Sequence, residues 1–147
     1  MVIVAVLAAI LLGRLLTYAE AYEKARMEVT LSRLQSGLYA RLAYLSLSGD
    51  QAAARALQTE SPFAAIGWRP PDYLGEFDGA PSGEPDGSWY FDRLSRELVY
   101  RPNLQRYFLA PDPPAARFQV ELRTDASGTA SGVRLVPTEP IRWEPVP

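Results

Sequence analysis

Cysteine and histidine are both absent from the 147 residues of this chain. Without them the chain forms no disulfide, no thiolate nucleophile, no imidazole base and no zinc site built from Cys and His. Ser32, Ser46 and Ser48 therefore have no histidine to activate them. The lack of cysteine does not identify the compartment, because an oxidising compartment permits disulfides without requiring them.

The chain also lacks a large net charge of either sign. The chain has 15 basic and 17 acidic residues and a formal net charge of −2, and all but one of the basic residues are arginines spread along the sequence. Binding to phosphate backbones relies on clustered positive charge in excess. Nucleic acid is therefore not expected as a partner. The length of the chain fits a single domain with a modest core.

Carboxylates could in principle supply an acid and a base. Glu20 and Glu23 fall on the surface of an expected helix, and Asp86 and Asp92 flank an expected strand, where turns favour aspartate. We expect these groups to be solvated, and we expect neither enzymatic activity nor a cofactor.

A calcium site would draw on oxygen atoms of the loop residues Asp72, Asp78 and Asp86. The sequence contains no spaced ligand loop of a known type, so no metal is predicted.

What the chain does have is an uninterrupted apolar run from Met1 to Leu12, followed by Gly13, Arg14 and two further leucines. The run is shorter than the roughly 20 residues that usually cross a bilayer, so we expect a membrane-inserting end that is cut short. A cleaved signal peptide, with Ala19-Glu20-Ala21 as its small-residue site, and a buried helix of a soluble globule are the alternatives. No basic residue precedes the apolar core, and the helical pattern continues through the supposed cut.

Beyond this run, leucines recur at steps of three and four and form one apolar face of a helix. No break appears before Ser48-Gly49-Asp50, which supplies a stop and a turn. The pattern predicts one helix from Met1 to about Leu47. The leucines expected to pack on the rest of the chain are Leu31, Leu34, Leu38, Leu42 and Leu45.

Residues 49–87 are expected to connect this helix to a sheet. The alanine-rich segment 51–58 predicts a short second helix that Ser61-Pro62 ends. Proline, glycine and aspartate then crowd the segment from Trp68 to Gly87, which predicts a long irregular connection. Its expected anchors are Trp68, Tyr73, Leu74 and Phe77.

Residues 88–147 are expected to form the sheet. Segments 88–92 and 97–101 are short and aromatic-rich and suit a hairpin. Segment 117–124 alternates strictly, and 132–136 is its return strand, stopped by Pro137. The proline-rich tail, 137–147, is expected to be extended and to lie along the sheet edge.

The expected fold class is α+β: a long N-terminal helix, apolar first and amphipathic second, packed against a small antiparallel sheet of about four strands. Three regions follow: an anchor and spine helix over 1–48, a connecting region over 49–87, and a sheet domain with a tail over 88–147. The sheet residues expected to face the helix are Trp89, Phe91 and Val99. The other aromatic residues could bind carbohydrate or peptide, but such residues are more often core.

In this plan the chain resembles type IV pilins and type II secretion pseudopilins. The run Val-Ile-Val-Ala-Val-Leu-Ala-Ala-Ile-Leu-Leu is similar to the interior of that family's N-terminal segment, and residues 21–26 are similar to its continuation. The hairpin of residues 87–102 resembles that of some pilin-like proteins. Family members also carry a basic leader, a Gly-Phe processing point and a Glu at the fifth mature position. None of these stands before Val2, so their roles are assigned to no residue here.

The resemblance implies a structural subunit that is anchored by its N-terminal helix and assembles through it into a type IV pilus or type II secretion pseudopilus. Its partners would be other pilin or pseudopilin subunits, the inner-membrane assembly platform and the membrane. It would lie as a single-pass protein in the bacterial inner membrane with its C-terminal domain in the periplasm, or in a filament. Small residues at helical spacing would let helices approach closely. The expected assembly face is Ala5, Ala8, Ala9, Leu12 and Gly13.

A different function fits the same topology. A membrane-anchored periplasmic adaptor would not polymerise and would bind a partner through the 68–87 segment or an exposed sheet edge.

Overall fold

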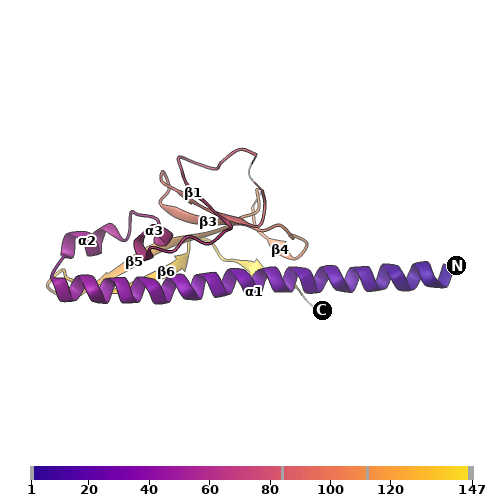
Figure 1. The fold of residues 1–147 in the computed structure, drawn as a ribbon, viewed down its shortest axis with the longest axis horizontal. Helices are drawn as coiled ribbons and strands as arrows, with labels where there is room; N and C mark the ends of the chain where they lie inside the picture. Colours follow the sequence, from indigo (N-terminus) through magenta and orange to yellow (C-terminus); the bar gives the residue numbers. More distant parts are fainter. Residues whose placement is uncertain (1, 84, 112, 146–147) are drawn as a thin grey trace.

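One long helix lies along one side of the molecule, and the rest of the described chain packs against it from about Thr17 onward (Figure 1). The computed structural model describes residues 2–83, 85–111 and 113–145. Met1, the predicted first residue of the helix, and Val146 and Pro147 of the predicted tail lie outside the described residues. Helix α1 spans Val2–Ser48 without a break, which confirms the predicted single helix over the described part.

A glycine in the left-handed conformation ends α1. Gly49 adopts a left-handed φ of 73°, and the N–H of Asp50 donates to the carbonyl of Leu45 at 3.0 Å. This geometry satisfies carbonyls that a helix end leaves unpaired. Asp50 then accepts a hydrogen bond from the Ala53 N–H at 3.0 Å and caps α2, Gln51–Ala56.

Helix α3, Pro62–Ile66, departs from the sequence prediction, in which Ser61-Pro62 only ends the preceding helix. A proline lacks the N–H that the first turn of a helix leaves unpaired, so it also starts helices well. Helix α3 crosses α1 at Gly37, where a Cβ atom would lie 2.9 Å from the side chain of Ile66. The missing side chain of Gly37 thus allows the two helices to approach.

The main sheet has five strands in the order β1-β2-β3-β5-β6. These are β1 (Tyr73–Phe77), β2 (Ser88–Asp92), β3 (Glu97–Arg101), β5 (Ala116–Thr124) and β6 (Ala130–Pro137). All neighbours are antiparallel except β1, which runs parallel to β2. The predicted α+β class is confirmed, with five strands rather than four.

The additional strand β1 corrects the prediction that residues 68–87 are irregular. Its sequence signal is weak because Gly75 adopts a φ of 123° and the pairing with β2 shifts register between Tyr73 and Glu76. A glycine and an irregular register inside a strand disturb the alternation from which strands are predicted.

A second, two-stranded sheet is formed by β4 (Phe108–Leu109) and β7 (Arg142–Trp143), and we call it the small sheet. The tail was expected along the edge of the main sheet. Its start still follows the main sheet, since Pro137 ends β6 and the Thr138 N–H donates to the carbonyl of Arg117 at 3.0 Å. Arg142 and Trp143 pair with β4 instead, where Phe108 stands opposite Trp143 and their rings meet edge to face at 5.3 Å.

The core lies between α1 and the main sheet. Met27 and Leu34 share one buried cluster with Trp89 and Phe91, and Leu31 packs against it half-buried. Further along the helix, three leucines share a second cluster with Val120 and Val133 of the sheet. These are Leu38, Leu42 and Leu45.

The prediction that Val99 faces the helix is wrong. Val99 is buried, but its neighbours Leu98 and Tyr100 are the β3 residues in the helix-facing cluster. Successive side chains of a strand point to opposite faces. Val99 therefore points to the other face, beside its cross-strand partner Tyr90.

The β6 edge of the sheet lies against α1. The side-chain amide of Gln35 donates from Nε2 to the carbonyl of Val133 at 2.9 Å. Its Oε1 accepts from the N–H of Leu135 at 2.7 Å. Gln51 of α2 accepts from the N–H of Ala130 at 3.1 Å. Backbone groups that a neighbouring strand would otherwise pair are thus bonded by side chains from the helices.

Candidate membrane anchor and its junction with the sheet domain

The first part of α1 projects beyond the sheet domain (Figure 1). Its large apolar side chains are exposed, from 78% at Val2 to 45% at Leu16. At 3.6 residues per turn, the exposed positions between them cover every side of the helix. A helix that is apolar all round requires an apolar environment.

The length of this segment suits a membrane. Its best 18-residue window has a mean hydropathy of 2.3, and 6% of that window is buried within the structure. Eighteen helical residues extend about 27 Å, close to the thickness of about 30 Å of a hydrocarbon core. Within the described residues, one helix, the N-terminal α1, is therefore long and apolar enough to cross a membrane.

The predicted assembly face lies in this segment. Ala5, Ala8, Ala9 and Leu12 are exposed, and Gly13 is half-buried. A Cβ atom placed on Gly13 would meet no atom within 4 Å. The helical repeat places Ala9 and Gly13 on the side that carries the sheet domain further along, with Ala5 and Leu12 beside them, whereas Ala8 is turned away by about 120°.

Glu20 marks the point where the projecting segment meets the folded domain. Its side chain is buried, with 1% exposed. One carboxylate oxygen, Oε1, accepts hydrogen bonds from the indole Nε1 of Trp143 at 2.9 Å and from the N–H of Tyr107 at 2.8 Å. One carboxylate thus binds two segments to the helix, around Tyr107 and around Trp143, which lie far apart in the sequence.

Glu23, nearly one turn later, binds the neighbouring loop. Its Oε1 accepts from the hydroxyl of Tyr100 at 2.9 Å and from the N–H of Asn103 at 2.6 Å. Its Oε2 accepts from the N–H of Leu104 at 2.9 Å. We call Glu20 and Glu23, together with the groups that they bind, the carboxylate clasp. Burial, together with the adjacent carboxylate of Glu23, raises the pKa of Tyr100 well above its ordinary value.

The expectation that Glu20 and Glu23 are solvated is therefore wrong. A signal was present in the sequence: Glu20 precedes Met27 by seven residues and Leu34 by fourteen, so it falls on the buried line of the helix. A carboxylate on such a line requires hydrogen-bond donors opposite it. The sequence did not indicate which residues would supply them.

The other candidate carboxylates are occupied by structural contacts. Arginines bind the three loop aspartates separately: Arg26 binds Asp72 at 3.4 Å, Arg93 binds Asp78 at 2.8 Å, and Arg101 binds Asp86 at 3.0 Å. Residues 2–83, 85–111 and 113–145 contain no group of three or more acidic residues placed to hold a metal ion.

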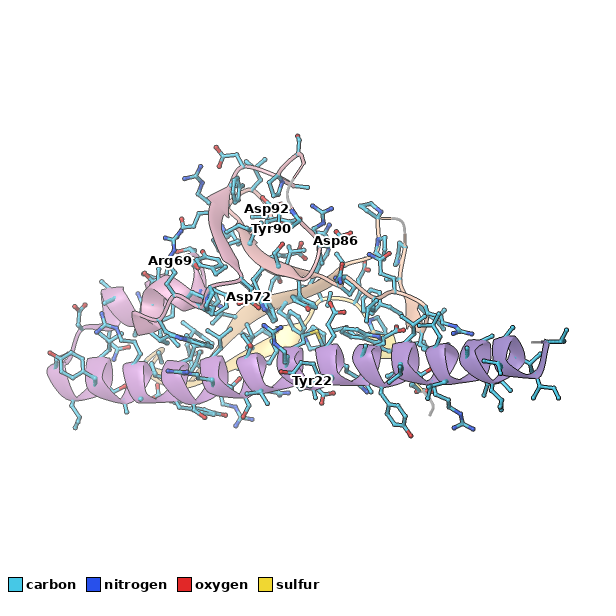
Figure 2. The ribbon with its side chains drawn as sticks, turned by 45° about the vertical axis from the view of Figure 1, so that its right-hand side comes forward. Tyr22, Arg69, Asp72, Asp86, Tyr90 and Asp92 are labelled. Atoms are coloured by element: carbon cyan, nitrogen blue, oxygen red, sulfur yellow. The ribbon has the colours of Figure 1, made fainter. Side chains whose placement is uncertain are left out.

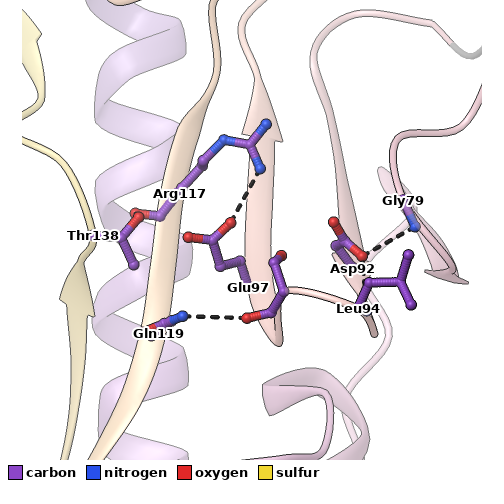
Figure 3. A network of polar contacts seen from close by, with 8 residues as sticks. Gly79, Asp92, Leu94, Glu97, Arg117, Gln119 and Thr138 are labelled. Atoms are coloured by element: carbon purple, nitrogen blue, oxygen red, sulfur yellow. Dashed lines mark hydrogen bonds and ion pairs between the residues drawn. The ribbon is translucent and has the colours of Figure 1, made fainter.

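Asp92 organises the turn between β2 and β3 (Figure 3). Its Oδ1 accepts from the N–H groups of Gly79 at 3.0 Å and Leu94 at 2.9 Å. Burial raises the pKa of Asp92, but the backbone N–H donors outweigh burial and leave the pKa below its ordinary value. Nearby, Arg117 of β5 binds Glu97 of β3 at 3.1 Å. These contacts hold the β2–β3 turn and its neighbouring strands together.

Comparison of the chain with protein-family models, curated proteins and solved structures found no match.

Proposed function

We propose that the chain is a structural pilin-like or pseudopilin subunit. Its N-terminal helix anchors it in the bacterial inner membrane and packs with the helices of other subunits in a type IV pilus or type II secretion pseudopilus. The sheet domain lies on the periplasmic side. The observation that carries the proposal is the division of α1: apart from exposed Arg14, the helix is apolar all round in its projecting part, and further along it supplies one side of the core of the folded domain.

This division suits assembly. In a bilayer the projecting part is surrounded by lipid, and in a filament it would be surrounded by equivalent helices. Exchange of one apolar environment for the other hydrates little surface, so the same segment serves as anchor and as assembly element. The sheet domain, carried on the second half of α1, would be displayed outside the bilayer or outside the packed helices of the filament.

The first test uses the full chain in bacterial membranes. Because the chain has no cysteine, a single introduced cysteine gives an unambiguous signal. Ala9→Cys should give oxidative dimers between copies in membranes, whereas Ser127→Cys, in the exposed turn before β6, should not. The chain should also stay with the membrane fraction after alkaline carbonate washing.

Each outcome separates the candidates. A chain released by the wash would show that α1 is no anchor and would overturn the proposal. A membrane-bound chain without Ala9→Cys dimers would favour the anchored adaptor. That alternative draws on one feature, an open groove of about 790 Å³ between α1 and α3 whose lining includes Arg33, Arg41 and Trp68.

A further inference from the structure

The small sheet lies at the level where α1 leaves the folded domain. Figure 1 shows β4 as the strand nearest the projecting segment. Figure 2 shows Arg69 and Asp92 farther from that segment than Tyr22 of α1 is. Thr17 is 6% exposed, whereas Leu16, the residue before it, is 45% exposed. The domain therefore begins to cover α1 where the exposed apolar side chains end.

This level corresponds to the surface of a bilayer that the projecting segment crosses. The four residues from Leu16 to Glu20 rise about 6 Å. The headgroup layer on one side of the hydrocarbon core is about 5–7 Å thick. Because Glu20 binds the indole of Trp143 and the N–H of Tyr107, the small sheet is held at the level of the headgroups.

The exposed face of the small sheet combines an apolar side chain with arginine. Phe108 and Trp143 pack in the core. Their strand neighbours Leu109 and Arg142 stand opposite each other in the sheet and point away from the core. Leu109 is 64% exposed, and Arg106 is exposed in the loop before β4. We call Arg106, Leu109 and Arg142 the small-sheet patch.

This combination of side chains suits the headgroup layer. An arginine places its guanidinium among lipid phosphates, whose oxygens accept its N–H groups, while its alkyl stem lies along apolar surface. Leu109 beside the two arginines can enter the upper part of the acyl chains, as apolar side chains of interfacial segments do. Tyr18 is 57% exposed on α1 at the same level, and tyrosine is enriched at membrane interfaces.

Continuity with the projecting segment favours lipid as the occupant over a protein partner. The segment brings the bilayer to the patch in every molecule that it anchors, so no second molecule has to be recruited. Among the described residues, the ion pairs involve neither Arg106 nor Arg142. Glu144 is exposed next to Trp143, so contact with the bilayer depends on Leu109 as well as on charge.

We propose that the small-sheet patch rests in the headgroup layer of the bilayer that α1 crosses, with Leu109 at the upper acyl chains and both guanidinium groups on lipid phosphates. This inference rests on the membrane anchoring in the proposed function, and it adds a contact by which the sheet domain itself binds lipid. It does not require that copies assemble. The contact would hold the domain in one orientation on the membrane surface.

One test measures the depth of the patch in vesicles of phosphatidylcholine and phosphatidylglycerol. Because the full chain has no cysteine, Leu109→Cys accepts a single fluorophore, which lipids brominated near the top of the acyl chain should quench. Leu94→Cys is the matched control. Leu94 is 75% exposed in the β2–β3 turn, at the opposite end of these strands from β4, and its label should not be quenched. A label at Ala9→Cys, within the projecting segment, should be quenched by lipids brominated deeper in the chain.

The outcomes separate this inference from the proposed function. Quenching at Ala9→Cys, with Leu109→Cys quenched no more than Leu94→Cys, would leave the anchor in place and overturn the inference. No quenching at either Ala9→Cys or Leu109→Cys would overturn both.

A second test changes the charge of the patch. Arg106→Glu with Arg142→Glu should reduce quenching of the Leu109→Cys label, because lipid phosphates repel carboxylates. Arg123→Glu with Arg134→Glu is the matched control, since both residues are exposed in the β5–β6 hairpin, and it should leave the quenching unchanged. Both double variants should keep the wild-type urea midpoint, so that reduced quenching is not loss of fold. Equal quenching in the two double variants would show that the patch arginines bind no phosphate and would overturn the inference.

Discussion

The indole of Trp143 donates its N–H to the carboxylate of Glu20 at 2.9 Å, across 123 positions of sequence. Both side chains are almost completely buried, with 2% of Trp143 and 1% of Glu20 exposed. This bond fixes the described end of the chain to the point where α1 leaves the sheet domain. Several consequences of the surrounding contacts can be measured.

Removal of the Glu20 carboxylate should destabilise the domain. Glu20→Ala leaves the buried donors of Trp143 and Tyr107 unpaired and should lower the free energy of unfolding by about 2–4 kcal/mol. Glu20→Gln keeps a hydrogen-bond acceptor and should lower the free energy of unfolding by less than Glu20→Ala does. Glu28→Ala is the control, because it removes only an exposed pair with Lys24 at 3.7 Å and should change stability by no more than about 0.5 kcal/mol. Urea unfolding of the full chain in micelles, followed by tryptophan fluorescence, measures all three, and equal midpoints for Glu20→Ala and Glu28→Ala would contradict the burial argument.

Tyr100 should make the domain sensitive to alkali. Because the pKa of Tyr100 is raised in the folded state by burial and by Glu23, the folded chain retains a proton that the unfolded chain loses. The contribution of the Tyr100 hydroxyl to the free energy of unfolding is fully present below the ordinary tyrosine pKa of about 10. It is lost as the pH rises toward the pKa of Tyr100 in the folded state. Tyr100→Phe should therefore show a flatter fall of stability above about pH 10 than the wild type. The check is the urea midpoint against pH, and parallel curves would refute it.

Two glycines of α1 should respond differently to replacement by alanine. Gly37→Ala places a Cβ 2.9 Å from the side chain of Ile66. Overpacking should lower the free energy of unfolding by about 1–3 kcal/mol, and the higher helix propensity of alanine should offset part of this loss. Gly13→Ala meets no atom within 4 Å and should not destabilise the chain. Thermal unfolding by circular dichroism compares them. The additional change Ile66→Ala should relieve part of the Gly37→Ala penalty, and no relief would place the strain elsewhere.

Asp92 should contribute to stability at neutral pH and lose that contribution in acid. Its pKa is lowered in the folded state, where the donors from Leu94 and Gly79 outweigh burial. The contribution is present above the ordinary aspartate pKa and disappears as the pH falls through the folded value. Asp92→Asn should be less stable than the wild type near pH 7, and the difference should shrink below about pH 4. A difference that is independent of pH would show that the turn depends on shape alone.

The helix and most of the sheet could be predicted because their signals are periodic. Leucines at steps of three and four gave α1, and strict alternation gave β5. Strand β1 could not be predicted in the same way, since Gly75 and the register shift break its alternation. Strands β4 and β7 have two residues each, too few for any period.

The candidate site was predictable only in part. The projecting apolar segment was evident from composition. The carboxylate clasp was not, because its donors are mostly backbone N–H groups and an indole that only the folded chain brings to Glu20 and Glu23. Side-chain identity along the sequence carries little information about where a backbone donor will lie.

The amide of Gln35 bonds the β6 edge as a neighbouring strand would, with one donor and one acceptor. A strand from another molecule would have to displace that amide, and α1 with it, before it could add to this edge. An exposed sheet edge is a common route to aggregation. Under the proposed function the domain is displayed at high local concentration on a membrane, where this hazard is greatest. The contacts of Gln35 therefore block growth of the sheet by strand addition at β6, and they leave the projecting helix able to make the contacts proposed for it.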